Sequence, residues 1–353
     1  MLLVGMPVMG DLQVRAKHFV RGKVWRFIVA LLAACSAFGV IAPAGLASPG
    51  STLSWVKRHP AKSPAARSLA AMAYDAATRQ VVLFGGGSGS GQGFGDTWTW
   101  NGSAWTKRHP ANSPPADYLA ATAYDAATRQ VVLFGGLSVT SGPARVLDGT
   151  WTWNGSTWTK RHPATSPPGQ FGAVMAYDAA TRQVVLLGGA NRTRYLGGTW
   201  IWNGSAWSRR HPASSPPAEL GAAIAYDAAT RQVVLFGGFS TSSRVLDGTW
   251  SWNGSTWTKR HPATRPPAVW NPAMAYDTAT RQVVLFGGSV RTTRLLDTTW
   301  IWNGSTWTKL HQATSPPALW EASMAYDVAA GNVVLFGGRG SKGGLLKDTW
   351  TRR

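Results

Sequence analysis

The chain has 353 residues and carries 35 Lys and Arg against 15 Asp and Glu, a formal net charge of +20. It contains 40 Gly, 21 Pro and 20 Trp but a single Cys, which excludes an intramolecular disulfide framework and a thiolate metal centre. Strongly basic chains of this kind favour anionic partners.

The first segment, residues 1–47, differs in composition from everything after it. Five Lys and Arg residues precede an apolar stretch that begins at Phe27, and small residues follow with cleavage-like sites ending at Ala44 or Ala47. This pattern predicts a secretory signal peptide and a secreted or cell-envelope protein. Two alternatives stay open: a retained membrane anchor, although the apolar stretch is short and contains Gly and Pro, and a lipoprotein leader, because Cys35 and the three residues before it match the bacterial lipobox.

Residues 48–353 are predicted to be one domain made of six copies of a repeat. A Tyr-Asp pair marks each copy, and successive pairs are 50, 53, 49, 50 and 50 residues apart. A period of this size means that each copy is one supersecondary unit, which buries its apolar faces only against its neighbours. The marker tyrosines are Tyr74, Tyr124, Tyr177, Tyr226, Tyr276 and Tyr326.

Each copy contains four short apolar runs bounded by turn residues. Runs this short and rich in Val, Trp, Thr and Tyr favour strands over helices. Asn101 and Gly102 between the last two runs are typical of a two-residue type I′ hairpin, which needs positive φ at both residues. In the first complete copy the runs are Ala71–Tyr74, Val81–Phe84, Thr97–Trp100 and Ala104–Lys107.

The two ends of the repeat region complete each other. The sixth copy stops after its third strand at residues 348–353, and residues 51–60 read as a fourth strand with no blade before it. Pairing the two fragments would remove an open sheet edge. The sequence therefore predicts an all-β, six-bladed β-propeller of four-stranded antiparallel blades, closed by an N-terminal outer strand that brings Trp55 close to Trp350.

These copies resemble the kelch family of propellers. The marks are the double glycine after the second strand, such as Gly85 and Gly86, the Trp that ends each copy, the aromatic residue of the Tyr-Asp segment and the ~50-residue period. The resemblance covers roughly residues 51–353 and implies the fold. Kelch propellers serve as enzymes, adaptors and lectin-like binders, so function has to come from the site.

Charge is predicted to concentrate on one face. Residues 48–353 carry 30 Lys and Arg against 14 Asp and Glu, a net charge of +16. The corners between blades and the loops between second and third strands, both rich in Lys and Arg, should open on one face. The opposite face should be near neutral, because its turns read Asp-x-x-Thr-Arg. A positive face attracts anionic partners such as glycans, anionic polymers or envelope proteins, whereas a secreted chain without a recognition helix or RNA-binding motif is not expected to bind nucleic acid.

The candidate binding site comes from positions where the copies differ. Three acidic residues fall outside the repeated Asp positions, and all precede the first strand of a copy: Asp117, Glu219 and Glu321. The first strand of a blade is innermost, so this segment should line the channel mouth. Carboxylates beside exposed aromatic rings suit carbohydrate, although drift at tolerant positions would give the same pattern. The expected ligand-binding residues are Arg67, Asp117, Tyr118, Gln170, Phe171, Glu219, Trp270, Asn271, Trp320 and Glu321.

Two functions are compatible with this mouth. The first is a non-catalytic binding protein, because no catalytic triad, metal site or cofactor motif can be demonstrated, and membrane association would come only through the leader or a lipid on Cys35. The alternative is an enzyme similar to the sialic-acid mutarotases, which have six kelch blades; that resemblance implies acid–base groups and an arginine, for which Asp117, Glu219, Glu321 and Arg67 are the candidates. Copper radical oxidases related to galactose oxidase are excluded, since they need a cysteine in the folded part.

Overall fold

The computed structural model describes residues 53–139, 143–291 and 294–353, with the backbone alone at Arg291. The expected signal peptide, its cleavage sites and Cys35 lie outside these residues. Across the described part of the chain, no helix has the length and apolar character needed to span a membrane.

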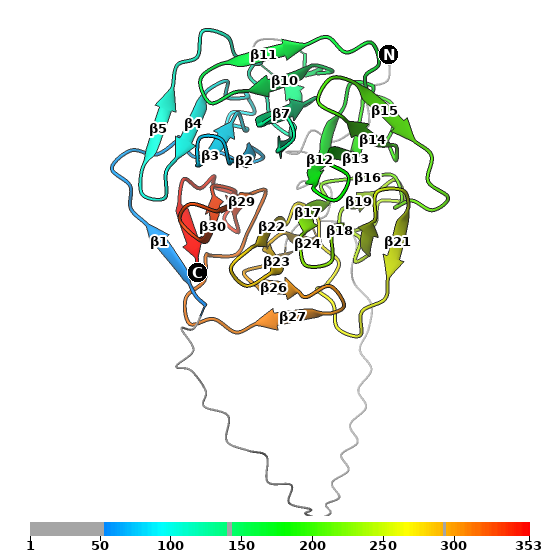
Figure 1. Ribbon diagram of the computed structural model, residues 1–353. Helices are drawn as coiled ribbons and strands as arrows, with labels where there is room; N and C mark the ends of the chain where they lie inside the picture. The colour runs from blue at the N-terminus through cyan, green and yellow to red at the C-terminus, as the bar shows by residue number, and fades with distance from the viewer. Residues whose placement is uncertain (1–52, 140–142, 292–293) are drawn as a thin grey trace, which may run out of the picture.

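Six four-stranded antiparallel blades form a ring (Figure 1). Blade 1 comprises β2 (Ala71–Asp75), β3 (Gln80–Phe84), β4 (Thr97–Trp100) and β5 (Trp105–Arg108). Blade 2 comprises β6 (Ala121–Asp125), β7 (Gln130–Phe134), β10 (Thr150–Trp153) and β11 (Trp158–Arg161). Blade 3 comprises β12 (Phe171–Asp178), β13 (Gln183–Ala190), β14 (Thr199–Trp202) and β15 (Trp207–Arg210). Blade 4 comprises β17 (Ala223–Asp227), β18 (Gln232–Phe236), β20 (Thr249–Trp252) and β21 (Trp257–Arg260).

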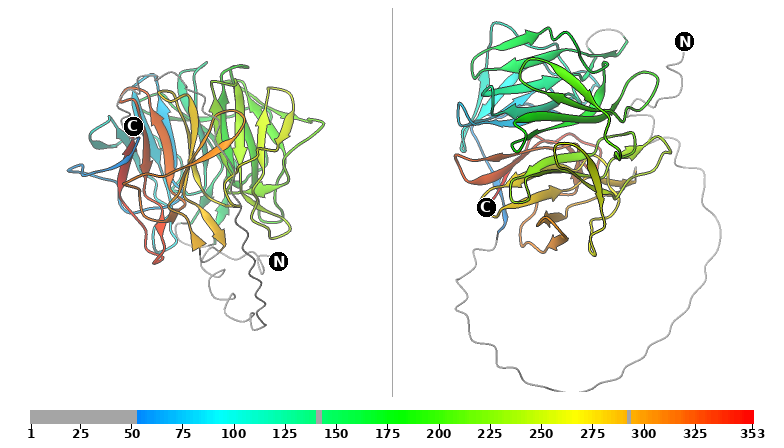
Figure 2. Two further views of the ribbon diagram at one scale, coloured as in Figure 1. Left: turned by 90° about the horizontal axis from the view of Figure 1, so that it is seen from below. Right: turned by 45° about the vertical axis from the view of Figure 1, so that its right-hand side comes forward.

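Blade 5 comprises β22 (Ala273–Asp277), β23 (Gln282–Phe286), β26 (Thr299–Trp302) and β27 (Trp307–Leu310), and blade 6 comprises β29 (Ser323–Asp327), β30 (Asn332–Phe336), β32 (Thr349–Arg352) and β1 (Trp55–Arg58). Short strand pairs decorate one end of the ring: β8 (Leu137–Ser138) with β9 (Arg145–Val146), β16 (Glu219–Leu220) with β19 (Phe239–Ser240), β24 (Ser289–Arg291) with β25 (Arg294–Leu295), and β28 (Leu319–Trp320) with β31 (Arg339–Gly340). The blade strands run along the propeller axis, so their connections gather at its two ends (Figure 2).

The predicted closure is confirmed. β1 pairs antiparallel with β32, with Trp55 opposite Arg352 and Lys57 opposite Trp350. Trp55 and Trp350 belong to the same apolar cluster between blades 5 and 6. The N-terminal strand therefore completes the last blade without a covalent hairpin to its partner.

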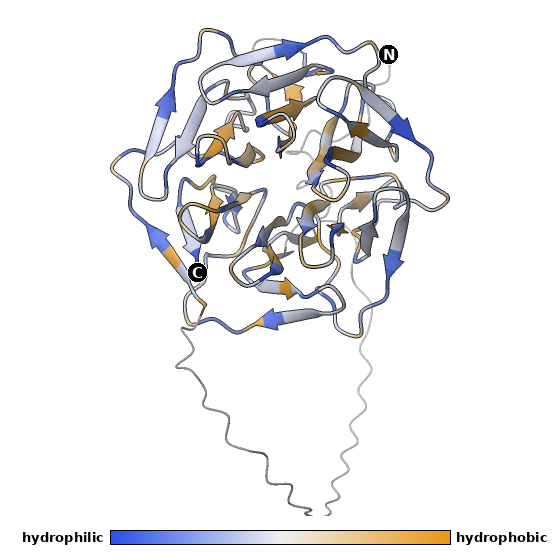
Figure 3. Ribbon diagram, in the orientation of Figure 1, coloured by the Kyte–Doolittle hydropathy of each residue, from blue (hydrophilic) through white to orange (hydrophobic). Residues whose placement is uncertain are grey.

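A repeated side-chain contact joins each blade to the one before it. Trp55 is buried, donates its indole N–H to Thr299 Oγ1 at 2.9 Å and packs edge to face on Phe286 of blade 5, with ring centroids 5.4 Å apart. Every other blade makes the same indole–threonine bond: Trp105 to Thr349, Trp158 to Thr97, Trp207 to Thr150, Trp257 to Thr199 and Trp307 to Thr249. The apolar core therefore lies between neighbouring blades and includes these outer-strand tryptophans, whereas the rest of each outer strand is mostly polar (Figure 3).

The Asn-Gly connections differ from the expected type I′ turn. Trp100 pairs with Trp105, so the loop has four residues rather than two. Gly102 has positive φ, but Asn101 does not; its side-chain Oδ1 instead accepts the backbone N–H groups of Ser103 and Ala104. Asn is required there as a local hydrogen-bond acceptor, the common arrangement of an Asx turn.

Blade 6 departs from the repeat at the end of its third strand. Arg352 is fully buried where the other five copies have Trp, and its guanidinium lies 3.2 Å from Asp277 of blade 5. Burial lowers the pKa of Arg352, and Asp277 opposes that shift. Blade 6 has no third-to-fourth-strand turn to cover the Asp277 carboxylate, and the arginine takes that position.

Candidate functional site

The segment before each first strand lies at the same end of the propeller as the loops between second and third strands. The backbone N–H of Asp117 donates to Phe94 in the loop of blade 1, and the Asp117 carbonyl accepts from Gly86 of the same blade. The same pair of bonds recurs at Gln170 and Val269 with the preceding blade. The interblade segments and these loops therefore share one face, as expected.

The residue seven positions before each marker tyrosine points back between two blades. Arg67, Asp117, Gln170 and Glu219 occupy this position and are all buried. Arg67 donates to Asp96 at 2.6 Å and to the Gly85 carbonyl at 2.8 Å, so its charge is committed to an internal ion pair.

Asp117 and Glu219 are buried without a matching charge. Both Asp117 carboxylate oxygens and Glu219 Oε1 lack a hydrogen-bond partner in the structure. Burial raises the pKa of both groups well above the ordinary range. Each carboxyl packs against the double glycine of its own blade, at Gly136 for Asp117 and at Gly238 for Glu219, where a Cβ atom would lie about 3 Å from a carboxylate oxygen.

The residue five positions before each marker tyrosine faces the propeller axis. All six of these residues have left-handed φ values, between 49° and 67°. Each backbone N–H donates to the corresponding carbonyl of the preceding blade, and the six bonds close a ring around the axis. The six residues, here called the axial ring, are Leu69, Leu119, Gly172, Gly221, Asn271 and Glu321.

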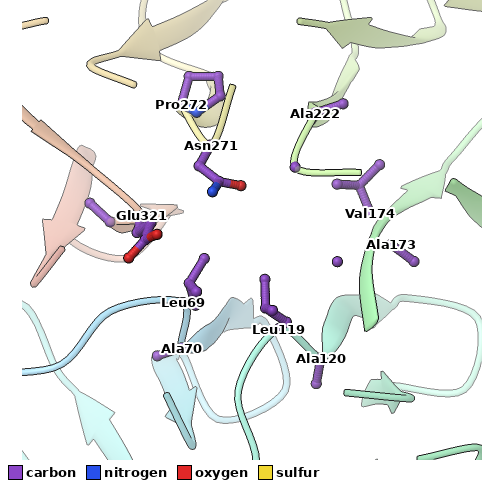
Figure 4. A pocket seen from close by; sticks show the side chains of 13 residues that line it. Leu69, Ala70, Leu119, Ala120, Ala173, Val174, Ala222, Asn271, Pro272 and Glu321 are labelled. Atoms are coloured by element: carbon purple, nitrogen blue, oxygen red, sulfur yellow. The ribbon is translucent and has the colours of Figure 1, made fainter. Parts of the chain in front are cut away.

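A cavity of about 170 Å³ lies at this ring. Asn271 and Glu321 supply its polar side chains, which point into the central space opposite Leu119 and Val174 (Figure 4). Asn271 Nδ2 is buried and has no hydrogen-bond partner among the described residues, whereas the buried Glu321 carboxylate has the side chains of Arg339 and Ser68 as its polar neighbours. The cavity is therefore apolar on one side and presents a donor and an acceptor on the other.

Arg339 and Ser68 are the polar neighbours of the Glu321 carboxylate in the described part of the chain. Arg339 Nε lies 3.5 Å from Glu321 Oε2, a separation typical of an ion pair rather than of a strong hydrogen bond. Burial raises the pKa of Glu321, and the positive charge of Arg339 opposes that rise. The pKa of the nearby Tyr118 hydroxyl is raised by burial and by the Glu321 charge. The Glu321 carboxyl and the Arg339 guanidinium thus lie together beside the cavity.

The aromatic residues of the mouth divide into two groups. Tyr118 and Phe171 are half-buried. Trp270 and Trp320 are buried edge to face against each other, with centroids 4.9 Å apart. The expectation of exposed rings therefore fails for the two tryptophans, because each packs beside its neighbour at the interblade corner.

Of the ten expected residues, Asn271 and Glu321 line the cavity. The residues that sequence reasoning missed are the apolar and glycine members of the axial ring and Arg339. Their position relative to the marker tyrosine could have indicated them: Glu321 lies five residues before its tyrosine, whereas Asp117 and Glu219 lie seven before theirs. Aligning the copies at this position would have separated the two kinds of carboxylate.

Burial makes the exterior more basic than the composition indicates. Nine of the 14 acidic residues after residue 47 are buried, whereas Arg67 and Arg352 are the buried ones among the basic side chains that the structure describes. On the face expected to be near neutral, Asp75 is buried and bonded to its own turn while Arg79 is exposed. The exposed charge at this turn is therefore positive and the buried charge negative.

A metal site receives no support from the described residues. They contain no group of three His, Cys, Asp or Glu side chains that could hold a metal ion.

Comparisons with known proteins support the fold. No protein-family model matches the chain, and no curated protein sequence matches it. A solved structure described as "Structure of YjhT" aligns with a TM-score of 0.64 and 15% identity, over 82% of this chain and 96% of that one. At this identity the likeness shows the β-propeller architecture, and membership of the kelch family stays a prediction.

Proposed function

We propose that this protein is a secreted or cell-envelope binding protein that holds a glycan at its axial cavity, with its basic exterior attracting anionic polymers or envelope components. The observation that carries the proposal is a pair of buried polar groups at the cavity: Asn271 Nδ2, which has no hydrogen-bond partner among the described residues, and the Glu321 carboxylate, whose contact with Arg339 is a long 3.5 Å. A buried donor without a partner is costly unless water or a ligand satisfies it, and a carboxylate can accept further hydrogen bonds beside a long ion-pair contact.

Carbohydrate fits this arrangement chemically. A sugar hydroxyl can donate to Glu321 and accept from Asn271, while the C–H face of the ring packs on Leu69 and Leu119 across the cavity. The axial ring also limits how a glycan enters. Hydrogen-bonded neighbouring backbones lie about 5 Å apart, so a six-membered ring leaves a radius of roughly 5 Å between the axis and the Cα atoms. Backbone atoms and two leucine side chains occupy part of that opening.

The test is a glycan array followed by calorimetry on the saccharides that bind, using Glu321→Gln and Asn271→Leu. We expect each variant to weaken binding by about tenfold, the equivalent of about 1.4 kcal/mol. Asp117→Asn is the matched control, because Asp117 belongs to the same segment but points away from the cavity. Unchanged affinity in both cavity variants would refute the cavity as the site.

A second candidate function rests on the pair of Glu321 and Arg339 beside the cavity. A buried carboxyl with a raised pKa beside a guanidinium is suited to proton transfer on an anionic substrate. In mutarotation, a proton moves to the ring oxygen and another leaves the anomeric hydroxyl, so the ring opens and closes with no net change in composition. NMR of the anomer ratio after adding the protein to α-sialic acid tests this activity. Faster equilibration that Glu321→Gln abolishes would support it, and an uncatalysed rate would exclude it.

A further inference from the structure

Blade 3 differs from the other five blades in the groups that surround its basic side chains. Between Asp178 and Glu219, both of which are buried, the sequence has no acidic residue and five arginines. Three separate departures from the repeat coincide in this blade: two remove a group that could bind an arginine of the outer strand, and the third replaces a lysine of that strand by arginine.

The first departure removes a hydroxyl. In blades 1, 2 and 4 the last arginine of the outer strand donates to a Thr or Ser on the third strand, as Arg161 does to Thr152 at 2.9 Å. A second bond to glutamine fixes the same guanidinium, as between Arg161 and Gln130. In blade 3 the hydroxyl residue is replaced by Ile201, and the structure gives Arg210 neither bond. In blade 5 the same isoleucine substitution, Ile301, is accompanied by Leu310 in place of the arginine.

The second departure removes a carboxylate. Every other copy has an aspartate at one of the two positions before the threonine that begins the third strand, and in blade 6 this aspartate, Asp348, pairs with Lys57 at 2.9 Å. Blade 3 has Gly197 and Gly198 at these positions. Arg209, which corresponds to Lys57, lies beside Gly198 and forms no ion pair with any residue that the structure describes.

The third departure concerns the type of cation. The counterpart of Arg209 is lysine in each of the other five copies. Arginine offers a planar fork of donors that binds an oxyanion through two hydrogen bonds, whereas lysine acts as a point charge. The change therefore adds directional oxyanion recognition at the outer strand of this blade.

The loop of the same blade adds a further cation. Arg194 is exposed and makes no side-chain hydrogen bond or ion pair with the described residues. It lies five residues before Thr199, which pairs with Arg210. Five residues span at most about 17 Å, so Arg194 lies within reach of the same extended ligand as the two outer arginines. Figure 1 shows β15 on the outside of the ring, where a polymer can approach it.

We propose that Arg194, Arg209 and Arg210 form a binding site on the rim of blade 3 for a polymer that carries regularly spaced phosphate or carboxylate groups. The inference rests on the proposed function in one respect, the attraction of anionic polymers, and it places that attraction on one blade. It is independent of the axial cavity.

The experiment measures binding of two probes, polyphosphate and polygalacturonate, by biolayer interferometry at about 0.1 M and 0.5 M salt. Arg209→Gln/Arg210→Gln is compared with Lys160→Gln/Arg161→Gln, which removes the same two charges from the corresponding strand of blade 2. We expect the blade 3 pair to weaken binding at least tenfold and the blade 2 pair less than threefold. The probe that binds more tightly identifies the preferred oxyanion.

A charge-neutral variant separates recognition from net charge. Ile201→Thr restores the hydroxyl that holds Arg161 in blade 2, so it should fix Arg210 internally and weaken polymer binding several-fold at unchanged charge. Thermal unfolding confirms that each variant is folded. Equal losses in the blade 2 and blade 3 pairs, with no effect of Ile201→Thr, would overturn the site but leave polymer binding intact. Failure of both probes to bind the unaltered protein would overturn the site and the anionic part of the proposed function, whereas glycan binding at the cavity would be unaffected.

Discussion

Trp55 and Trp105 occupy the same structural position, but only Trp105 belongs to an outer strand that is joined to its neighbouring strand by a turn. Each is buried, each donates its indole N–H to a threonine of the preceding blade at 2.9 Å, and each packs edge to face on a phenylalanine, Phe286 or Phe336. Trp105 belongs to a strand that a four-residue turn ties to its neighbour, whereas Trp55 belongs to β1, which has no such turn. Changing each to Ala therefore compares the same lost contact with and without a covalent connection.

The local cost of the two changes should be similar. Replacing a buried Trp by Ala costs about 3–5 kcal/mol through lost transfer free energy and the cavity left behind. β1 has four paired residues. Its other side-chain contacts with blade 6 include the half-buried Arg58, which donates to Thr351, and Lys57, which pairs with Asp348 and has its Nζ 5.9 Å from the Trp350 ring centroid. An exposed ion pair contributes about 0–1 kcal/mol. Without Trp55 the strand should therefore detach and leave β32 as an open edge.

Urea unfolding and hydrogen exchange measure these effects separately. Both variants should lose about 3–5 kcal/mol of unfolding free energy, but Trp55→Ala alone should expose the backbone amides of β32 that bond to β1. It should also increase self-association, because an unpaired edge accepts strands from other molecules. Equal exchange protection of β32 in the two variants, with no association in either, would refute the view that the noncovalent strand is the weak point of the ring.

Three further changes test the buried charges and the strained turns. Burial raises the pKa of Asp117, so the protonated carboxyl contributes stability at low pH, and this contribution is lost as the pH rises from the ordinary carboxyl range to the raised value. Asp117→Asn should remove this decline. The variant should therefore unfold at a higher temperature than the unaltered protein at pH 7 but not at pH 3. Arg352→Ala leaves the Asp277 carboxylate buried without its cation and should lower the unfolding free energy by about 3–5 kcal/mol in chemical denaturation. A loss below about 1 kcal/mol would show that the pair does not hold blades 5 and 6 together. Arg129 has a φ of 58° at a turn position where the sixth copy has Gly331. Arg129→Gly should therefore relieve backbone strain and raise the unfolding free energy by up to about 1 kcal/mol in the same assay. A clear loss of stability would instead mean that the Arg129 side chain stabilises the turn.

The architecture could be predicted because the repeat supplies the same information six times. The 50-residue period, the four apolar runs and the split last blade each constrain the ring, and a misjudged detail in one copy is corrected by the others. The Asn-Gly turn shows where local pattern misleads. Asn101 fits both a type I′ turn and an Asx turn, and the choice depends on whether Trp100 pairs with Trp105, which the dipeptide itself does not reveal.

The cavity was predicted less completely because a left-handed residue changes the direction of the side chains that follow it. In a regular strand, positions seven and five before the marker tyrosine would face the same side. The positive φ at Leu119 and Glu321 breaks this alternation, so Asp117 turns inward between blades while Glu321 faces the axis. Gly172 and Gly221 at the same position in two copies are the sequence sign of that conformation.

Departures from a repeat carry functional meaning only when the lost internal contact is known. Asp117 and Glu219 stand out in the sequence, yet both are enclosed between blades. Ile201 is inconspicuous, since isoleucine is common in strands, and its consequence appears only because the hydroxyl in the other blades holds an arginine in place. In a protein made of near-identical copies, a residue that leaves a neighbour without its usual partner is therefore a stronger indication of a binding site than a residue that is merely unusual.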